Sequence, residues 1–309
     1  MINVLFAAGD ARWEQYRETL PRALADAGLV ADVGTDHPPG SADYVVCAPD
    51  GPVADFSPFV RAKAVLSLWA GVEKLVGNPT ISQPFCRMAD PALKEGMAEW
   101  VVGHALRHHL GMDAHISNPE RAWAPKAPPL ARDRRTSVLG LGELGAACAQ
   151  ALAALNFDVA GWSRRPKELS GVTCHAGEAG LDAALARADI LVLLLPLTAA
   201  TESILDAARL SLLPEGATVL NPGRGGLIDD DALLAALDSG RLAHATLDVF
   251  RVEPLPQDHP FWAHPKVTVT PHVAAETRPA SASRAIAENI RRSEAGEPLL
   301  NLVDRASGY

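Results

Sequence analysis

The stretch that decides the fold is Ser137-Val-Leu-Gly140-Leu-Gly142-Glu-Leu-Gly145. It joins an apolar run, typical of a buried strand, to a helical pattern that covers residues 146–155. In a strand–turn–helix of this kind, Gly140 allows a tight turn and Gly142 lets the backbone approach a pyrophosphate. Gly145 lets the helix pack closely on the strand, and the helix N-terminus offers free N–H groups and partial positive charge. This stretch therefore predicts a dinucleotide-binding unit.

Apolar runs and helical patterns alternate on both sides of this stretch, which is typical of parallel βαβ units. From residue 136 onward we expect six strands, the number of a complete dinucleotide-binding sheet: Thr136–Leu139, Asp158–Trp162, Ile190–Leu195, Ala217–Asn221, Ala245–Val249 and Val267–Thr270. The first hundred residues alternate in the same way, with strands expected at Ile2–Ala8, Tyr44–Ala48 and Ala64–Trp69 and a helix at Trp13–Ala27. Further helices are expected at Ala92–Gly111 and Ala280–Gly296, with a Pro-rich connection at Pro119–Pro129. The predicted class is α/β, with two doubly wound parallel-sheet domains.

The bulk composition favours a globular protein. Of 309 residues, 48% are hydrophobic and 21% are charged, and the formal net charge of −9 argues against a nucleic-acid partner. The most apolar stretch, Ile190–Leu197, is too short to span a bilayer, and Met1–Trp13 lacks the features of a signal peptide. The four cysteines lack CxxC spacing, so reduced thiols, a cytoplasmic location and no membrane partner are expected.

The end of the second strand of the cofactor sheet predicts which dinucleotide is bound. NAD enzymes place a carboxylate there to accept hydrogen bonds from the ribose hydroxyls. Here the strand leads into Ser163-Arg164-Arg165-Pro166-Lys167, which holds three cations and no carboxylate. A hydroxyl and guanidinium groups can hold a 2′-phosphate through charge-assisted hydrogen bonds. We expect NADP to be preferred and NAD to be possible; the alternative is a solvated loop with incidental charge.

Three further segments end on residues whose chemistry suits the reduction of a 2-oxo acid. Arg224, Glu253 and His272 each follow a predicted strand of the same sheet, and open α/β sheets bind ligands at the carboxyl ends of their strands. Arg224 would bind a carboxylate and polarise the carbonyl, His272 would protonate the forming alkoxide, and Glu253 would hold His272 in its charged form. Singly, each has an ordinary structural explanation, and His104, His108 and His109 are interpreted as a structural helix face.

From Thr136 to Ala275 the chain resembles the D-isomer-specific 2-hydroxyacid dehydrogenases. The resemblance rests on the glycine-rich turn, Asn221–Gly226 with Asp231-Ala-Leu-Leu, Leu247-Asp-Val-Phe with Glu253-Pro254, and Thr270-Pro-His272. Thr268–Pro279 and the closing Val303–Tyr309 resemble the glyoxylate/hydroxypyruvate reductase A branch.

The resemblance implies reduction of small 2-oxo acids, such as glyoxylate and hydroxypyruvate, to D-2-hydroxy acids with NADPH. It implies a Rossmann-type cofactor domain (103–282) inserted in a flavodoxin-like substrate domain (1–102 with 283–309), and a homodimer paired through the cofactor domains. It also implies that Ala70, Gly71 and Val72 bind the substrate carboxylate, together with Arg224 and His272. No metal is expected. The remaining expected cofactor contacts are Glu143, Leu144, Leu195, Pro196, Pro222, Gly223, Asp248 and Ala274.

Two departures from the branch bear on the substrate. Ala48 stands where a bulky aromatic residue is expected, which would leave extra room, and the segment Met88–Met97 also differs from the expected pattern. Three alternatives stay open. The chain could be an NAD-dependent phosphoglycerate-type dehydrogenase, a formate dehydrogenase, or a non-catalytic dinucleotide-sensing binding protein on the same fold.

Overall fold

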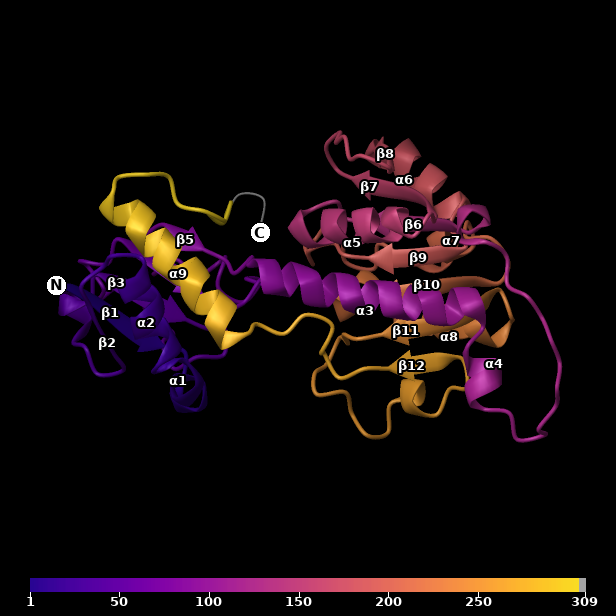
Figure 1. The fold of residues 1–309 in the computed structure, drawn as a ribbon, viewed down its shortest axis with the longest axis horizontal. Helices are drawn as coiled ribbons and strands as arrows, with labels where there is room; N and C mark the ends of the chain where they lie inside the picture. The colour runs from indigo at the N-terminus through magenta and orange to yellow at the C-terminus, as the bar shows by residue number, and fades with distance from the viewer. Residues whose placement is uncertain (306–309) are drawn as a thin grey trace. The chain divides into compact units, whose positions relative to one another are not determined.

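The chain forms two compact units, each built on its own parallel sheet (Figure 1). The computed structural model describes residues 1–305. One unit comprises Met1–Leu93 and the chain from Thr277 onward, and the other comprises Lys94–Glu276. The last four residues of the closing segment Val303–Tyr309 lie outside the described residues.

The first unit contains a five-stranded sheet with the order β2-β1-β3-β4-β5, which is the flavodoxin-like order. All neighbouring strands are parallel. Apolar side chains of three helices cover one face, and apolar side chains of the loops at 53–62 and 72–81 fill the other. The elements are β1 (Ile2–Ala7), α1 (Asp10–Tyr16), α2 (Thr19–Asp26), β2 (Ala31–Gly34), β3 (Tyr44–Cys47), β4 (Ala64–Ser67), β5 (Phe85–Cys86) and α9 (Pro279–Glu294).

The three strands expected in this unit are confirmed, each ending one or two residues early. The single helix expected at Trp13–Ala27 is wrong, because the chain breaks at Arg17 into α1 and α2. Strands β2 and β5 were not predicted. They have four and two residues, too few for a clear apolar pattern, so they are defined by backbone pairing with β1 and β4.

The second unit contains a seven-stranded parallel sheet with the order β12-β11-β10-β9-β6-β7-β8. The chain order reverses between β6 and β9, and dinucleotides bind beyond the carboxyl ends of strands at such a switch point. The strands are β6 (Arg135–Leu139), β7 (Asp158–Ser163), β8 (Thr173–Ala176), β9 (Ile190–Leu193), β10 (Ala217–Asn221), β11 (Leu242–Leu247) and β12 (Val267–Val269). All six expected strands are present, and β8 is an additional edge strand with little apolar character.

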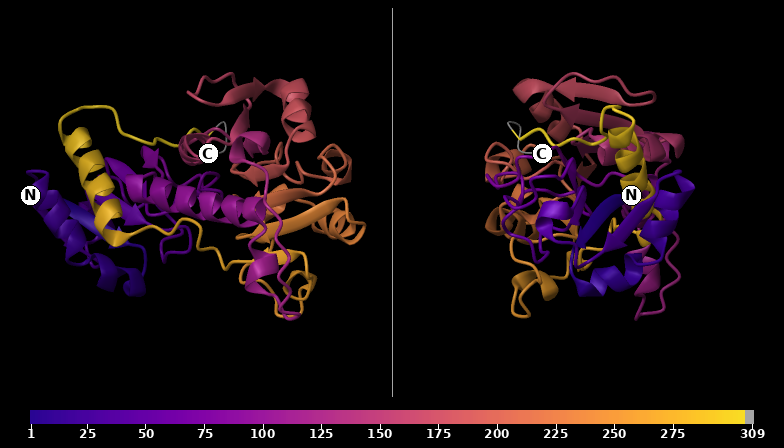
Figure 2. Two further views of the ribbon diagram at one scale, coloured as in Figure 1. Left: turned by 45° about the vertical axis from the view of Figure 1, so that its right-hand side comes forward. Right: turned by 90° about the vertical axis from the view of Figure 1, so that its left-hand side faces the viewer.

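Helices cover both faces of this sheet. Helices α3 and α5 pack on one face through residues such as Val101 and Leu152, and α6 and α8 pack on the other through Leu181 and Leu233. Figures 1 and 2 show α3 running along the sheet on the side of α5. The helices are α3 (Pro91–Leu110), α4 (Asp113–Ile116), α5 (Glu143–Ala154), α6 (Gly177–Ala186), α7 (Ala207–Leu210) and α8 (Asp230–Asp238).

Helix ends follow the expected chemistry. Pro91 and Pro279 stand at the first positions of α3 and α9, where the missing N–H group costs nothing. An oxygen of Asp90, in the divergent segment Met88–Met97, accepts the N–H of Leu93 at 2.7 Å. Gly296 follows α9 with a φ of 69°.

Among the described residues, no helix is both long and apolar enough to cross a membrane.

Candidate active site

The glycine-rich turn between β6 and α5 is shaped for close approach. Gly140 has a φ of 103°, and a Cβ there would lie 2.4 Å from the carbonyl oxygen of Leu194. A Cβ on Gly145 would lie 1.8 Å from the carbonyl oxygen of Gly140, whereas one on Gly142 would meet nothing within 4 Å. The outer two glycines are therefore required by packing, and the middle one leaves open space beside the N-terminus of α5. This division matches the predicted roles of the three glycines.

Predicted contacts Glu143 and Leu144 begin α5 directly after this turn, and Glu143 pairs with Lys94 of α3.

The cationic loop, residues 163–167, lies next to the same turn. Strand β7 ends at Ser163, whose hydroxyl donates to the carbonyl of Arg165 at 2.7 Å. The ammonium group of Lys167 donates to the carbonyl oxygen of Leu141 inside the glycine-rich turn, at 2.5 Å. This bond places the exposed Arg164 and Arg165 at the edge of the turn.

His272 and Glu253 form a hydrogen-bonded pair. Nδ1 of His272 lies 2.7 Å from Oε2 of Glu253, and Oε1 of Glu253 accepts the backbone N–H of Phe250 at 2.9 Å. The side chains are 50% and 34% exposed. The contact with Glu253 uses Nδ1 of the imidazole and not Nε2.

Electrostatics favour the charged form of both partners. The hydrogen bond that His272 donates to Glu253 raises the pKa of His272, while burial and the charge of Arg224 oppose that rise. Burial acts to raise the pKa of Glu253, but the hydrogen bonds from His272 and Phe250 outweigh it and the pKa is lowered. At neutral pH this arrangement stabilises an imidazolium facing a carboxylate.

Arg224 follows β10, half-buried in a loop that precedes the short 3₁₀ turn Gly225–Leu227. Its guanidinium donates to the carbonyl oxygen of Gly223 at 2.6 Å, and the amide of Asn221 donates to the carbonyl of Arg224 at 3.0 Å. The charge of Arg224 acts to lower the pKa of both Glu253 and His272. The three predicted residues therefore lie close enough to interact electrostatically.

A buried carboxylate holds the turn that carries His272. Asp248 accepts the hydroxyl of Thr270 at 2.6 Å and the backbone N–H groups of Val273 and Ala274 at 2.9 Å each. Its carbonyl accepts the N–H of His272 at 2.8 Å, and His272 itself has a φ of 55°. The predicted cofactor contacts Asp248 and Ala274 therefore bond to each other and hold the turn that carries His272. A cofactor contact of either residue stays a prediction.

Arg251 is a positioning residue that sequence analysis missed. Its Nη2 donates to the carbonyl of Ile228 at 2.6 Å and to the hydroxyl of Ser203 at 2.7 Å. The loops of Arg224 and Glu253 also touch, because a Cβ on Gly225 would lie 2.0 Å from the carbonyl carbon of Phe250. The only signal in the sequence is one more cation in a loop, which is not distinctive.

The other predicted contacts divide between the two units. Leu195, Pro222 and Gly223 are buried and follow β9 and β10, and the carbonyl of Pro196 accepts the hydroxyl of Thr201 at 2.6 Å. In the first unit Ala70, Gly71 and Val72 form the turn after β4. Ala48 is 4% exposed and belongs to the core under α1 and α2. The extra room expected beside the substrate stays a prediction.

The second unit therefore combines a dinucleotide-type glycine turn, an acid–base pair and a guanidinium at one edge of a parallel sheet. This combination defines a nicotinamide-nucleotide-dependent oxidoreductase class. Residues 101–274 match the family model for the D-isomer specific 2-hydroxyacid dehydrogenase, NAD binding domain. The chain belongs to the D-isomer specific 2-hydroxyacid dehydrogenase family.

Similar proteins include glyoxylate/hydroxypyruvate reductase A of Serratia proteamaculans (strain 568), 36% identical over 319 residues, with all of both chains covered. A D-isomer specific 2-hydroxyacid dehydrogenase from Xanthobacter autotrophicus Py2, solved with NADPH and MES, has a TM-score of 0.92 and 41% identity, covering 100% of this chain and 99% of the other. The NADPH-dependent glyoxylate/hydroxypyruvate reductase from Sinorhizobium meliloti, solved with NADP and sulfate, has a TM-score of 0.86 and 35% identity with the same coverage.

Proposed function

We propose that this protein reduces small 2-oxo acids to D-2-hydroxy acids with NADPH. The observation that carries the proposal is the His272–Glu253 pair beside Arg224, because these residues supply a proton donor, its partner and a carboxylate-binding cation in one unit. The relatives named above include reductases of glyoxylate and hydroxypyruvate, and these two acids are the proposed substrates.

The residues at the glycine turn suit a phosphorylated dinucleotide. The open space at Gly142 and the N-terminus of α5 would receive the pyrophosphate. Ser163, Arg164 and Arg165 at the end of β7 would hold a 2′-phosphate, since no carboxylate stands at this strand end to repel it. When bound there, NADPH supplies the hydride that reaches C2 of the substrate.

The side chains then have separate tasks. Arg224 binds the substrate carboxylate and draws electron density from the carbonyl. Nε2 of His272 donates its proton to the carbonyl oxygen as that oxygen becomes an alkoxide, and Glu253 stabilises the imidazolium until the proton leaves. The products are the 2-hydroxy acid, the oxidised nucleotide and a neutral imidazole, which regains a proton from solvent. In the first unit, backbone N–H groups of Ala70, Gly71 and Val72 are proposed to bind the carboxylate.

The proposal is tested by turnover of a panel of 2-oxo acids. Purified protein is mixed with glyoxylate, hydroxypyruvate and larger 2-oxo acids, each with NADPH and with NADH, and the nicotinamide absorbance is followed. We expect turnover of the small acids with preference for NADPH. Binding of NADPH without turnover of any acid would favour the dinucleotide-sensing protein, and preference for NADH with a phosphorylated 3-carbon acid would favour the phosphoglycerate-type enzyme.

The domain roles and the assembly are part of the same proposal. We propose that the first unit is the substrate domain, the second is the cofactor domain, and two copies pair through the cofactor domains. Support comes from apolar side chains on α4 and the Pro-rich segment after it, where Ile116 is 78%, Trp123 93% and Leu130 59% exposed. The four cysteines are unpaired thiols in the described chain, which suits the proposed cytoplasmic location.

A further inference from the structure

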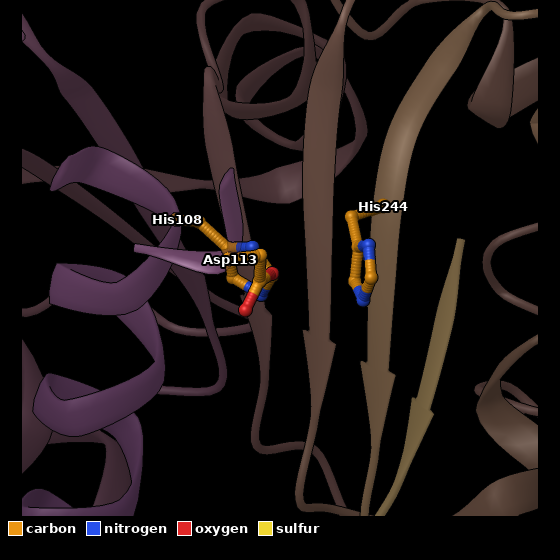
Figure 3. Close-up of side chains that lie close together, drawn as sticks. All are labelled: His108, Asp113 and His244. Atoms are coloured by element: carbon orange, nitrogen blue, oxygen red, sulfur yellow. The ribbon is translucent and has the colours of Figure 1, made fainter. Parts of the chain in front are cut away.

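Three side chains that could hold a metal ion meet on the second unit. His108 comes from the last turn of α3, Asp113 from the first residue of α4 and His244 from β11 (Figure 3). One ring nitrogen of each imidazole and one carboxylate oxygen lie within 4.8 Å of one another. The proposed reaction uses none of these residues.

Each of the two imidazoles contacts a threonine hydroxyl, and both threonines lie on the same face of the sheet. Nε2 of His108 lies 2.9 Å from Oγ1 of Thr246, and Nε2 of His244 lies 2.9 Å from Oγ1 of Thr268. The ring centroids are 4.8 Å apart. A metal-binding histidine typically donates its second ring N–H to an oxygen, which fixes the ring and its tautomer. Both histidines have such an oxygen.

The carboxylate is also fixed, and it faces water. Oδ1 of Asp113 accepts Nε of Arg107 at 2.7 Å, which lowers the pKa of Asp113 and keeps it ionised. The second oxygen, Oδ2, takes part in no hydrogen bond or ion pair with the rest of the described chain, and the side chain is 46% exposed. An ion can therefore reach the cluster from solvent.

We propose that His108, Asp113 and His244 bind one divalent transition-metal ion of the zinc class, with water completing a tetrahedral shell. Two nitrogens and one carboxylate oxygen are a ligand set that suits this ion rather than magnesium or calcium. Ligand atoms around tetrahedral zinc lie roughly 3.4 Å apart, given metal–ligand distances of about 2.0–2.2 Å. The candidate ligand atoms lie within 4.8 Å of one another, so small side-chain rotations would bring them to the tetrahedral distances.

The state of the imidazoles agrees with this proposal. The pKa of His108 is lowered to about 3 and that of His244 to about 4, mainly by burial, with the charge of Arg107 acting in the same direction. Neutral rings keep a lone pair for a metal without first losing a proton.

The ion would stabilise the unit rather than take part in catalysis. His244 lies on β11, four residues before Asp248, which follows the strand and bonds to the turn that carries His272. Since a strand rises about 3.3 Å per residue, His244 lies roughly 13 Å from Asp248. Bound metal would join the end of α3 and the start of α4 to β11. This inference does not depend on the proposed function, because metal binding is measured without substrate.

Calorimetric titration of the metal-free full-length protein with Zn²⁺ tests the proposal, and Co²⁺ absorption reports the geometry. We expect one ion per chain, micromolar or tighter affinity, and the visible bands of tetrahedral Co²⁺. His244→Gln and Asp113→Asn should each weaken binding at least tenfold. His115→Ala is the matched control, because His115 is an exposed imidazole on the same short helix and should leave binding unchanged.

Asp113→Asn keeps the shape of an exposed side chain, so it separates ligand loss from misfolding. Its far-UV circular dichroism and NADPH affinity should equal those of the unmodified protein. The proposal is overturned if no saturable binding occurs at micromolar Zn²⁺. It is equally overturned if Asp113→Asn and His244→Gln leave the affinity intact, or if His115→Ala weakens binding as much as they do.

Discussion

Replacing Glu253 by Gln should move the pH dependence of the reaction while preserving the shape of the site. The hydrogen bond that His272 donates to Glu253 raises the pKa of His272, so the protonated imidazole is present below that pKa and is lost as pH rises through it. Reduction uses the protonated form and should fall along this limb; oxidation of the 2-hydroxy acid should rise. In Glu253→Gln the limb for reduction should move to lower pH.

The size of the effect follows from the geometry of the pair. A charge-assisted hydrogen bond contributes about 1.5–3 kcal/mol and a neutral one about 0.5–1.5 kcal/mol. Because the side chains of His272 and Glu253 are 50% and 34% exposed, solvent screening favours the lower values. A loss of about 1 kcal/mol of imidazolium stabilisation reduces the protonated fraction of His272 roughly fivefold at pH values above its pKa in both proteins. At pH values below both pKa values, kcat/KM for reduction should change little.

The assay is kcat/KM for glyoxylate reduction with NADPH across the pH range, with NADPH affinity measured separately. His272→Ala is the companion variant; it removes the proton donor and should lower kcat by roughly 10²–10⁴ while NADPH binding is kept. A limb that stays in place in Glu253→Gln would refute the role of Glu253. Near-normal turnover of His272→Ala would refute the proton donor itself.

Three further predictions concern cofactor choice, the glycine turn and assembly. Replacing Arg164 and Arg165 together by Ala should weaken NADPH binding at least tenfold, since each charge-assisted contact contributes about 1.5–3 kcal/mol. The affinity for NADH should stay unchanged. An equal loss of affinity for both nucleotides, measured by fluorescence titration, would contradict the proposed phosphate contact. Gly145→Ala places a Cβ 1.8 Å from the carbonyl oxygen of Gly140, so it should lower Tm by several degrees and weaken cofactor binding. An unchanged melting curve would contradict the tight packing at this glycine. Trp123→Ser should raise the dissociation constant of the dimer more than about tenfold, as loss of a buried interface Trp does; light scattering at several concentrations measures it. A dimer that is unchanged at all concentrations would place the interface elsewhere.

Local signals made much of the second unit predictable. The spacing of Gly140, Gly142 and Gly145 has a mechanical cause within one turn, so the turn could be identified before any tertiary contact was known. The strand before Arg224 is a buried, mostly apolar run, the strand before His272 carries two valines, and parallel topology sends the carboxyl ends of both to the same edge. The juxtaposition of these residues therefore followed from sequence pattern and topology together.

Elements without a local signal could not be predicted. Strands β2, β5 and β8 are short, and each is defined by pairing with a longer neighbour. The roles of Asp248 and Arg251 depend on hydrogen bonds to backbone groups and side-chain hydroxyls that are between 22 and 48 residues away. A side chain of this kind looks in the sequence like any other polar residue in a loop.

The sequence by itself determined the fold class, the glycine turn, the cationic loop after Trp162 and the set Arg224, Glu253 and His272, because these depend on periodicity and on residues at strand ends. Only the tertiary structure showed which atoms of the predicted pair meet, Nδ1 of His272 and Oε2 of Glu253, and that Asp248 holds the turn that carries His272. It alone brought His244 beside His108, which the sequence places on a separate element. The physical reason is that pattern reports which face a residue occupies, whereas a hydrogen bond or a ligand cluster requires atoms of distant segments to meet within a few ångströms.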